Sequence, residues 1–384
     1  MSTKVQLARA GRYGHIDAMR AVAVLLVVVA HAGLGHIVPG GSGVTIFFAI
    51  SGFIITHLVL REHARTGGFD VGRFYFRRLL KLAPPFVVIV AIPTTIYCYW
   101  NPVRLTDFLA QMFFWFNWVY MSGNHDVLPG SGVVWSLAVE EQFYIVFALM
   151  WLWLVRSPKR LVLLGVLAAL AAAGSLCIRL YIAETGFSHN RVYYGTDTRI
   201  DGIAIGVFAA VLFSFIERHP DRFQYVRRAL SSDWVVALAS CGYLFSLLLR
   251  DEYFRETFRY SIQALCAAAL VVYGLIQTES GLRRLMQCLA NVSVVQTVGL
   301  ASYSIYLVHL SLNHLLLPVL AGWPKASVVI LLSVLGMAAG VMIWRLIEVP
   351  VESYKRRFEA RGIGSTGGGR SNADLTSVVE GGVA

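Results

Sequence analysis

The stretch IDAMRAVAVLLVVVAHAG, residues 16–33, has ten uninterrupted apolar residues between Arg20 and His31. Eleven residues at 3.6 per turn make about three turns, so the pattern predicts a helix with both side chains on one face, about 16 Å apart along the axis. A guanidinium and an imidazole at membrane depth are costly, and such residues mark functional sites by default. The alternative is that Arg20 reaches the headgroups and His31 bonds to a neighbouring helix.

The composition of the whole chain places this helix in a polytopic membrane protein. Of the 384 residues, 57% are hydrophobic and only 14% are charged. A soluble protein carries nearer to one quarter charged residues. Ten apolar stretches are about long enough to cross a bilayer: 17–36, 44–60, 79–100, 135–155, 161–182, 199–216, 233–250, 260–278, 297–317 and 327–347. We therefore predict an all-α bundle of about ten transmembrane helices.

The segment 106–120 is apolar but short, and the distribution of basic residues decides whether it crosses. If it does not cross, loops and tails on the N-terminal side hold 24 Lys and Arg against 7 on the other side. If it crosses, the count becomes 15 against 16. The positive-inside rule favours the first topology. We expect a re-entrant or interfacial segment at 106–120, both termini in the cytoplasm, and a multi-pass protein of the plasma membrane, which is the inner membrane in a bacterium.

The charge and the ends of the chain complete the domain prediction. The net charge of +11 could suggest nucleic acid, but the basic residues are spread over short loops between spans, so we expect a lipid bilayer as the partner and no nucleic acid. Residues 1–15 form a basic cytoplasmic lead, 16–350 the membrane domain, and 351–384 a cytoplasmic tail that we expect to be disordered from about 361. Five scattered cysteines predict neither a disulfide framework nor a metal site.

A basic motif follows the second predicted span. The loop 61–81 carries six basic residues, and Arg77, Arg78 and Lys81 precede two prolines, Pro84 and Pro85. Several cations beside a helix break suit a phosphate-rich ligand such as a nucleotide thioester, because guanidinium forks match phosphate oxygens. The alternative is an ordinary anchor of the positive-inside kind.

Two adjacent carboxylates, Glu140 and Glu141, stand in WSLAVEEQFY at the start of the fourth span. We place them about 8 to 9 Å below the outer boundary, and His31, about 21 Å along its own span, at nearly the same depth. A carboxylate beside an imidazole raises its basicity and orients its ring, as a general base requires. The alternative, a structural carboxylate at a helix end, fits one of the two glutamates.

The stretch YYGTDTRIDGIAIG, residues 193–206, places Asp197, Arg199 and Asp201 at the outer mouth of the sixth span. This alternation of acid, base and acid either binds a polar acceptor or forms a charge network that satisfies itself.

The stretch ASYSIYLVHL, residues 301–310, places Tyr303, Tyr306 and His309 in the ninth span. A lone histidine in an apolar helix is more often a packing residue than a catalyst, so His309 ranks below His31.

Together these motifs resemble the acyltransferase-3 family of integral membrane O-acyltransferases. The matching elements occur in the family's order and cover nearly the whole chain: Arg20 and His31 with ten residues between them, SGFIIT, FRRLLKLAPP, WSLAVEEQFY, TRIDGIAIG, SYSIYLVH and IEVPVE. The resemblance implies transfer of an acyl group, acetyl in the first place, from cytoplasmic acyl-CoA to a hydroxyl of a glycan or lipid-linked sugar at the outer face. It implies acyl-CoA as a co-substrate and no permanently bound cofactor. Many relatives carry a C-terminal SGNH-type hydrolase domain, which we do not expect in this chain.

The resemblance also implies roles for particular residues. It makes His31 the catalytic histidine and Arg20 essential for handling the donor, and it puts Glu140 or Glu141 in the working site with Arg199. Lys81 stands where the family often has Arg. Lys keeps the positive charge but cannot donate the two parallel hydrogen bonds of a guanidinium group. We assign these residues to an acceptor or structural site: Trp135, Ser136, Asp197, Arg199, Asp201, Tyr303 and His309.

The expected mechanism has acyl-CoA steered by Arg20, Arg77, Arg78 and Lys81, while His31, oriented by a glutamate, deprotonates the acceptor hydroxyl. A covalent acyl-histidine is the alternative route. One rival is a proton-coupled secondary transporter that uses the same buried charges, although the chain shows no internal repeat. A second rival is another membrane O-acyltransferase fold, for which His309 is the candidate base.

Overall fold

The computed structural model describes residues 13–123, 127–186, 188–276 and 278–355, and within these residues it contains helices and no strands. The elements of the first half are α2 (Gly14–Val29), η1 (Ala30–Leu34), α3 (Gly40–Thr66), α4 (Val71–Phe86), η2 (Val87–Ala91), α5 (Ile92–Trp100), α6 (Leu105–Met112), α7 (Phe116–Met121), η3 (Ser131–Val133) and α8 (Val134–Leu154). Those of the second half are α9 (Arg160–Thr185), α10 (His189–Tyr194), α11 (Thr196–Arg218), α12 (Gln224–Leu230), α13 (Asp233–Leu248), α14 (Glu252–Glu256), α15 (Phe258–Leu275), α16 (Gly281–Ala290), α17 (Ser293–Leu300), α18 (Ser302–Leu316), α19 (Lys325–Ile343) and η4 (Trp344–Glu348).

The predicted all-α polytopic fold is confirmed. Among the described residues, eight helical segments are long and apolar enough to cross a membrane, and two further pairs reach that length if each bent pair is one span. The bent pairs are α12 with α13, at 57°, and α17 with α18, at 72°. They correspond to the predicted spans 233–250 and 297–317, so the sequence places these segments correctly but does not reveal their bends.

The segment 106–120 forms two short helices, α6 and α7, of 8 and 6 residues. Neither helix is long enough to cross a bilayer, which needs about 20 residues. They are separated by a turn at which Phe114 takes a left-handed conformation, φ 59°. This geometry is consistent with the expected interfacial or re-entrant segment.

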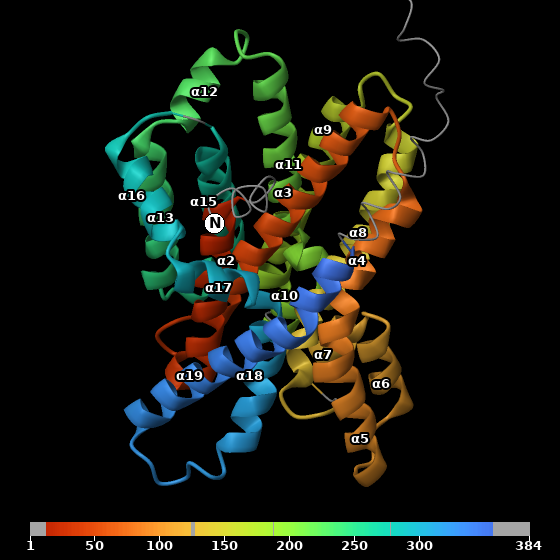
Figure 1. Cartoon of the computed structure of the whole chain (residues 1–384), viewed down its shortest axis with the longest axis vertical. Coiled ribbons are helices and arrows are strands. Elements are labelled where there is room, and N and C mark those ends of the chain that lie inside the picture. The colour runs from red at the N-terminus through yellow and green to blue at the C-terminus, as the bar shows by residue number, and fades with distance from the viewer. Residues whose placement is uncertain (1–12, 124–126, 187, 277, 356–384) are drawn as a thin grey trace, which may run out of the picture.

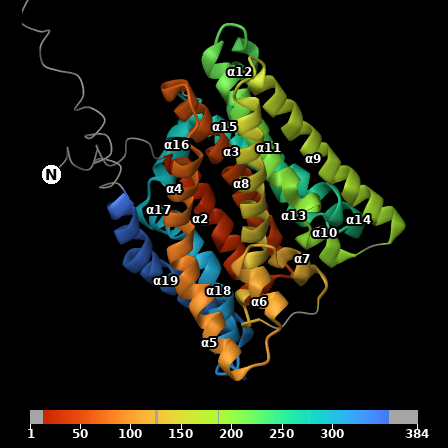
Figure 2. The ribbon, with the colours of Figure 1, turned by 90° about the vertical axis from the view of Figure 1, so that its right-hand side faces the viewer.

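Two helices, α3 and α11, form the centre of the bundle, and both are mostly buried, whereas α9 and α19 lie at its edges (Figures 1 and 2). Helices α3 and α11 pack closely against each other, because a glycine on each helix faces the backbone of the other. A Cβ at Gly52 would collide with the Ile203 carbonyl, and one at Gly206 with the Ala49 carbonyl. Small residues at such crossings allow close packing in membranes, where helices gain little from burying apolar surface.

The variant Gly206→Val is expected to lower the free energy of unfolding by about 1–3 kcal/mol, because the added methyls overpack the crossing of α3 and α11. Thermal unfolding of the purified protein in detergent measures this effect. Gly174→Val is the matched control, since α9 has open space around Gly174. Equal unfolding temperatures for the two variants would contradict the packing account.

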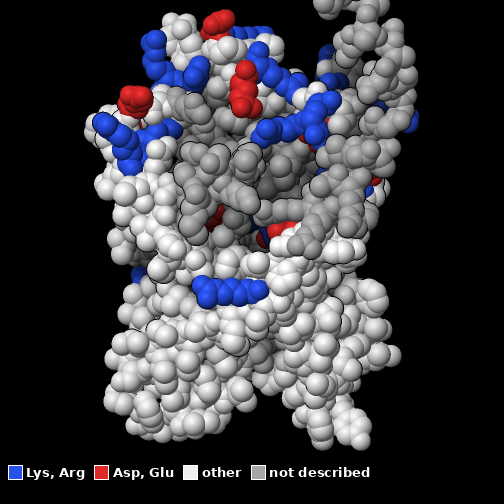
Figure 3. Space-filling view, viewed as in Figure 1, with Lys and Arg blue, Asp and Glu red and all other residues white. Residues whose placement is uncertain are grey.

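The charged side chains gather at one end of the bundle. We call this the charged end; it holds the ends of α3 at Thr66, of α9 at Arg160 and of α11 at Arg218. In Figure 3 the blue and red residues cluster at the top of the view, and the lower part of this face is almost entirely white. Helix α2 runs away from the charged end toward the opposite one, which we call the His31 end.

Helix α2 begins at Gly14, three residues before the predicted start, and its regular turns end at Val29. A π-helical turn, η1, then carries His31 and ends at Leu34; inside it lies Gly33, whose φ of 126° only glycine adopts easily. Single π turns inside helices are frequent at functional sites. Residues 1–12 of the predicted lead lie outside the described residues.

The last described helix runs from Lys325 to Lys355. Residues 351–355, which the sequence placed in the tail, therefore continue this helix. The part of the tail that was expected to be disordered, from about 361, lies outside the described residues.

Candidate functional site

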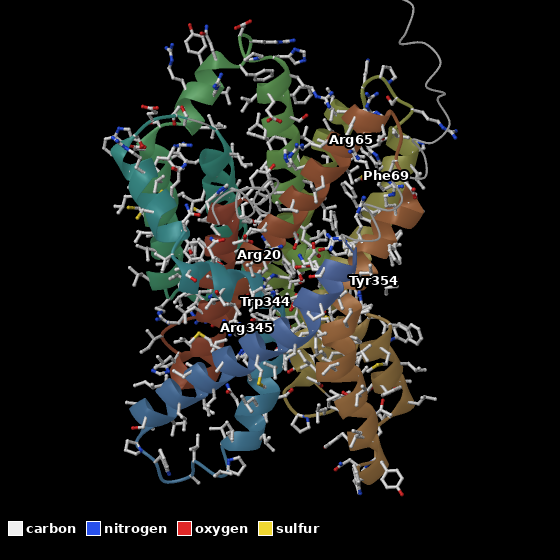
Figure 4. All side chains as sticks on the ribbon, in the orientation of Figure 1. Arg20, Arg65, Phe69, Trp344, Arg345 and Tyr354 are labelled. Carbon is white, nitrogen blue, oxygen red and sulfur yellow. The ribbon has the colours of Figure 1, made fainter. Side chains whose placement is uncertain are left out.

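A cavity of about 800 Å³ lies between α2, α3, α4, α8, α18 and the helix that ends at Lys355. The residues that line it on α3 run from Val44 to Val59, a rise of about 22 Å. Figure 3 shows a hollow in this face with charged side chains inside it, and Figure 4 labels two of the lining residues, Arg20 and Trp344, in the middle of the bundle. The cavity thus follows the long axis of the helices from the charged end inward.

All four predicted donor-binding residues line the cavity: Arg20, Arg77, Arg78 and Lys81. Arg77 is neutralised, because its Nη2 lies 2.6 Å from the Glu62 carboxylate. The other three take part in none of the ion pairs formed among the described residues. The cavity therefore offers three cationic side chains without a paired carboxylate.

Arg78 is held in place by an aromatic ring. Its guanidinium carbon lies 3.4 Å from the centroid of Tyr144, within range of a cation–π contact. Its Nε is buried and has no hydrogen-bond partner among the described residues. A buried donor without a partner costs free energy, which a bound acceptor group could recover.

Four acidic side chains also line the cavity, those of Asp17, Glu140, Glu348 and Glu352. Two of them, Glu140 and Glu348, accept a hydrogen bond from a neighbouring hydroxyl. The Tyr144 hydroxyl donates to Glu140 Oε2 at 2.7 Å. The Ser304 hydroxyl donates to Glu348 Oε1 at 2.5 Å. Both glutamates lie within the electrostatic reach of Arg20. Glu141 does not line the cavity, and its buried Oε1 has no partner in the part of the chain that is described.

Ser136 and Tyr306 line the inner end of the cavity, together with Val44 and Phe47. The hydroxyls of Ser136 and Tyr306 lie 2.7 Å apart, and the Tyr306 hydroxyl also donates to the Val133 carbonyl at 3.1 Å. One helical turn beyond Tyr306 lies His309, with the two ring centroids 5.9 Å apart. Tyr306 therefore separates the cavity from the first of two histidines.

His31 and His309 form a hydrogen-bonded pair at the His31 end of the cavity. The distance from His31 Nδ1 to His309 Nε2 is 2.9 Å, and the rings stack with centroids 5.1 Å apart. His309 is fully buried, whereas His31 is exposed. Neither imidazole lines the cavity itself. The pair thus lies between the inner end of the cavity and the surface.

The expectation that a glutamate orients His31 is wrong in this structure, because the partner of its Nδ1 is His309. Glu140 lies one turn of α8 from Ser136, on the side of the charged end, and His309 lies one turn of α18 beyond Tyr306 on the other side. These offsets add up to about 10 Å along the helices. The depth argument failed because α2 starts earlier than predicted and because His31 lies in the π turn beyond its regular part.

The residues Asp197, Arg199 and Asp201 do not line the cavity. Asp197 is paired with Arg191, and Asp201 with the buried Arg179 at 2.7 Å. The two acids are thus paired with arginines outside the motif, whereas Arg199 takes part in none of the ion pairs among the described residues and its buried Nη1 has no hydrogen-bond partner there. The contacts satisfy the two carboxylates but not the arginine between them.

Arg199 is buried with its guanidinium carbon 3.9 Å from the centroid of Tyr260, and its Nη2 donates to the Thr45 hydroxyl at 3.2 Å. Trp135 packs against Tyr193 and Tyr194, with ring centroids 5.1 and 5.2 Å away. Both residues belong to the packing around α11. Tyr303 lines the cavity and donates to the Leu82 carbonyl at 3.1 Å.

Sequence reasoning missed two groups of cavity residues. Tyr306 was seen in its motif but given no role, and Glu348 and Lys355 were placed near or beyond the end of the last span. The sequence did contain a sign of the role of Glu348, because burying a carboxylate at the end of a membrane span costs free energy and such residues often belong to functional sites. For Tyr306 the signal was its position three residues before His309, on the same helix face.

Comparisons with known proteins find similar acyltransferases. Residues 13–345 match a family model described as an acyltransferase domain. A Staphylococcus aureus (strain COL) protein named as a putative O-acetyltransferase is 30% identical over 307 residues, which cover 77% of this chain and 49% of the relative. The peptidoglycan O-acetyltransferase OatA of Listeria monocytogenes serovar 1/2a is 29% identical over 350 residues, 88% of this chain and 55% of the relative.

The O-acetyltransferase OatA of Staphylococcus aureus (strain NCTC 8325 / PS 47) is 32% identical over 209 residues, 52% of this chain and 34% of the relative. The chain thus spans about half the length, or less, of these curated relatives. No solved structure matches it at a significant level. The family model covers most of the chain, and the motifs that carry the resemblance contribute the residues of the cavity and of the histidine pair. The chain belongs to the family of membrane proteins built on this acyltransferase domain.

Proposed function

We propose that this chain is a membrane O-acyltransferase that takes an acetyl group from cytoplasmic acetyl-CoA and transfers it to a sugar hydroxyl at the outer face. The observation that carries the proposal is the cavity, which leads from the charged end, past three unpaired cations, to within one helical turn of His309. The names of the relatives support the reaction class, and that of the Listeria relative makes a cell-wall glycan the first acceptor to test.

The cavity suits acyl-CoA in charge and in length. The nucleotide end of the donor carries several phosphate charges, and Arg20, Arg78 and Lys81 can neutralise them. Arg fits phosphate oxygens with two parallel hydrogen bonds, whereas Lys acts as a point charge. The rise of about 22 Å along α3 leaves room for an extended pantetheine arm that directs the thioester toward Ser136 and Tyr306.

In the proposed reaction, His31 acts as a general base toward an acceptor hydroxyl that arrives from the His31 end. The hydroxyl proton moves to His31 while the oxygen forms a bond to the thioester carbon. The carbon–sulfur bond then breaks, and the proton held by His31 passes to the CoA thiolate, which leaves as the thiol and returns His31 to its neutral form. The hydroxyls of Ser136 and Tyr306 line the inner end of the cavity and now donate to each other or to the Val133 carbonyl. One of them stabilises negative charge on the thioester carbonyl oxygen by turning its hydrogen from that acceptor to the substrate.

The orientation follows from the distribution of basic residues. The charged end belongs to the cytoplasmic side by the positive-inside rule, so the donor cavity faces the compartment that holds acetyl-CoA. The exposed His31 then lies toward the outer face.

The purified protein in detergent, given radiolabelled acetyl-CoA and soluble peptidoglycan fragments, is expected to form a base-labile ester on a sugar. Mass spectrometry locates the acetyl group. Binding of acetyl-CoA without transfer to any of a panel of glycan and lipid-linked sugars would overturn the proposal. Proton-coupled flux in proteoliposomes without an acetylated product would point to a transporter instead.

A further inference from the structure

We propose that His309 is a positioning residue that fixes the tautomer of His31, so that Nε2 of His31 presents the lone pair that accepts the substrate proton. The proposal deepens the proposed function and rests on it for its catalytic part. The assignment of the proton itself rests only on the hydrogen bonds of the two rings.

The argument begins at a backbone carbonyl. His309 Nδ1 lies 3.1 Å from the Ile305 carbonyl oxygen. A carbonyl can only accept a hydrogen bond, so Nδ1 of His309 must carry the hydrogen. The Ile305 carbonyl, one turn before His309 on α18, therefore determines that Nδ1 of His309 is protonated.

The second step concerns the other nitrogen of His309. The ring is fully buried, and its hydrogen-bond partners among the described residues are the backbone carbonyls of Ile305 and Tyr306 and the ring of His31. A charged imidazolium at this place, without a hydrogen-bonded carboxylate, is expensive. His309 is therefore neutral, and its Nε2 must accept the hydrogen bond at 2.9 Å from His31 Nδ1.

The third step follows for His31. Its Nδ1 donates, so in the neutral ring Nε2 is unprotonated. The described residues offer Nε2 no hydrogen bond, and the side chain is exposed. This is the form that a general base requires. In serine proteases a buried aspartate holds the catalytic histidine in the same tautomer; here a carbonyl acts through a second histidine.

The backbone around the carbonyl is held tightly. Two glycines of α19 let it pack directly on this turn of α18. A Cβ at Gly340 would collide with the Cα of Ile305, and one at Gly336 would lie 3.2 Å from the Cβ of His309. Close contact of this kind fixes the carbonyl and the imidazole relative to α2 and η1, which meet α19 at Val28 and at Gly33 respectively.

Nitrogen-15 NMR of histidine-labelled protein in micelles tests the proton assignment without any reaction. The signals of His31 are identified by their loss in His31→Gln. The wild-type protein is expected to show a protonated Nδ1 and an unprotonated Nε2 at His31. A protonated Nε2 in the wild-type protein would overturn the proposal, whether or not the protein transfers acetyl groups.

Two variants test the role in catalysis. His309→Gln keeps an amide oxygen able to accept from His31 Nδ1, so the tautomer should persist and kcat should stay within about tenfold of wild type. His309→Leu offers no acceptor, so the two tautomers should mix and kcat should fall by about 10²-fold, while the KM for acetyl-CoA stays unchanged.

Equal losses of kcat in the two variants, or an unchanged His31 spectrum in His309→Leu, would contradict the positioning role. Because the wild-type spectrum and its assignment require only the His31→Gln variant to fold, the proposal stays testable if His309→Leu is unstable. A wild-type protein with the expected tautomer but no acyl transfer would refute the proposed function and leave the proton assignment standing.

Discussion

His31→Gln is expected to lower the rate of acetyl transfer by about 10²- to 10⁴-fold, which is the contribution that a general base typically makes. The binding of acetyl-CoA should be unaffected, because His31 does not line the cavity that we propose for the donor. Transfer from radiolabelled acetyl-CoA measures the rate, and equilibrium dialysis measures donor binding. The expected signature is a loss in kcat with an unchanged dissociation constant for the donor.

His36→Gln is the matched control for this prediction. His36 lies five residues further along the same segment and is exposed, and among the described residues only its backbone carbonyl takes part in a hydrogen bond, which it accepts from Arg250. We expect it to keep wild-type activity. Full activity in His31→Gln would refute the role of His31. Equal losses of activity in both variants would also contradict it, because they would show that any substitution in this segment impairs the enzyme.

Arg78→Gln is expected to weaken acetyl-CoA binding by about 10- to 100-fold. A hydrogen bond to a charged group contributes about 1.5–3 kcal/mol, and 1.4 kcal/mol corresponds to a factor of ten. Arg78 has the strongest case among the three unpaired cations, because its Nε is buried without a partner and Tyr144 already fixes its position. Arg78→Lys should give an intermediate loss, since Lys keeps the charge but not the fork.

Arg73→Gln is the control for this second prediction. Arg73 lies on the same helix, α4, but it is exposed, lies 3.8 Å from the carboxylate of Asp70 and does not line the cavity. It should bind acetyl-CoA like the wild-type protein. If the affinity for acetyl-CoA falls equally in both variants, α4 attracts the donor only through its overall charge, and the specific phosphate site is wrong.

The bundle was predictable because the bilayer fixes the length of its helices. An apolar stretch of about 20 residues is most readily explained as a transmembrane helix. The basic residues in the loops predict in which direction each helix crosses the membrane. The bends at α12–α13 and α17–α18 were not predictable in this way, because they interrupt the axis and leave the hydropathy unchanged. The same holds for the π turn at His31, which only Gly33 hints at.

The candidate site was predictable in part. The cations of the proposed donor site follow from a local pattern, since Arg77, Arg78 and Lys81 lie on one helix. Arg20 lies within a membrane span, where a charged side chain costs so much free energy that it indicates a functional role. The partner of His31 was not predictable, because it depends on how α18 packs against α2. The two histidines are 278 residues apart in sequence, and the packing of α19 on α18 decides which of their ring nitrogens meet.

The glutamates illustrate the limit of depth arguments. Counting about 1.5 Å per residue placed Glu140 and Glu141 level with His31. In the structure Glu140 lines the middle of the cavity and accepts from Tyr144 instead. An error of three residues in the start of one helix already moves a side chain by about 4–5 Å, which is enough to exchange one hydrogen-bond partner for another.

The account's central claim is that the donor enters from the charged end and the product forms at the His31 end. Sealed membrane vesicles of both orientations, given radiolabelled acetyl-CoA that cannot cross the bilayer, test it most directly. Inside-out vesicles should incorporate label into glycan enclosed in their lumen, and right-side-out vesicles should not react with donor added outside. Labelled glycan on the same side as the donor, or equal labelling in both orientations, would contradict the account.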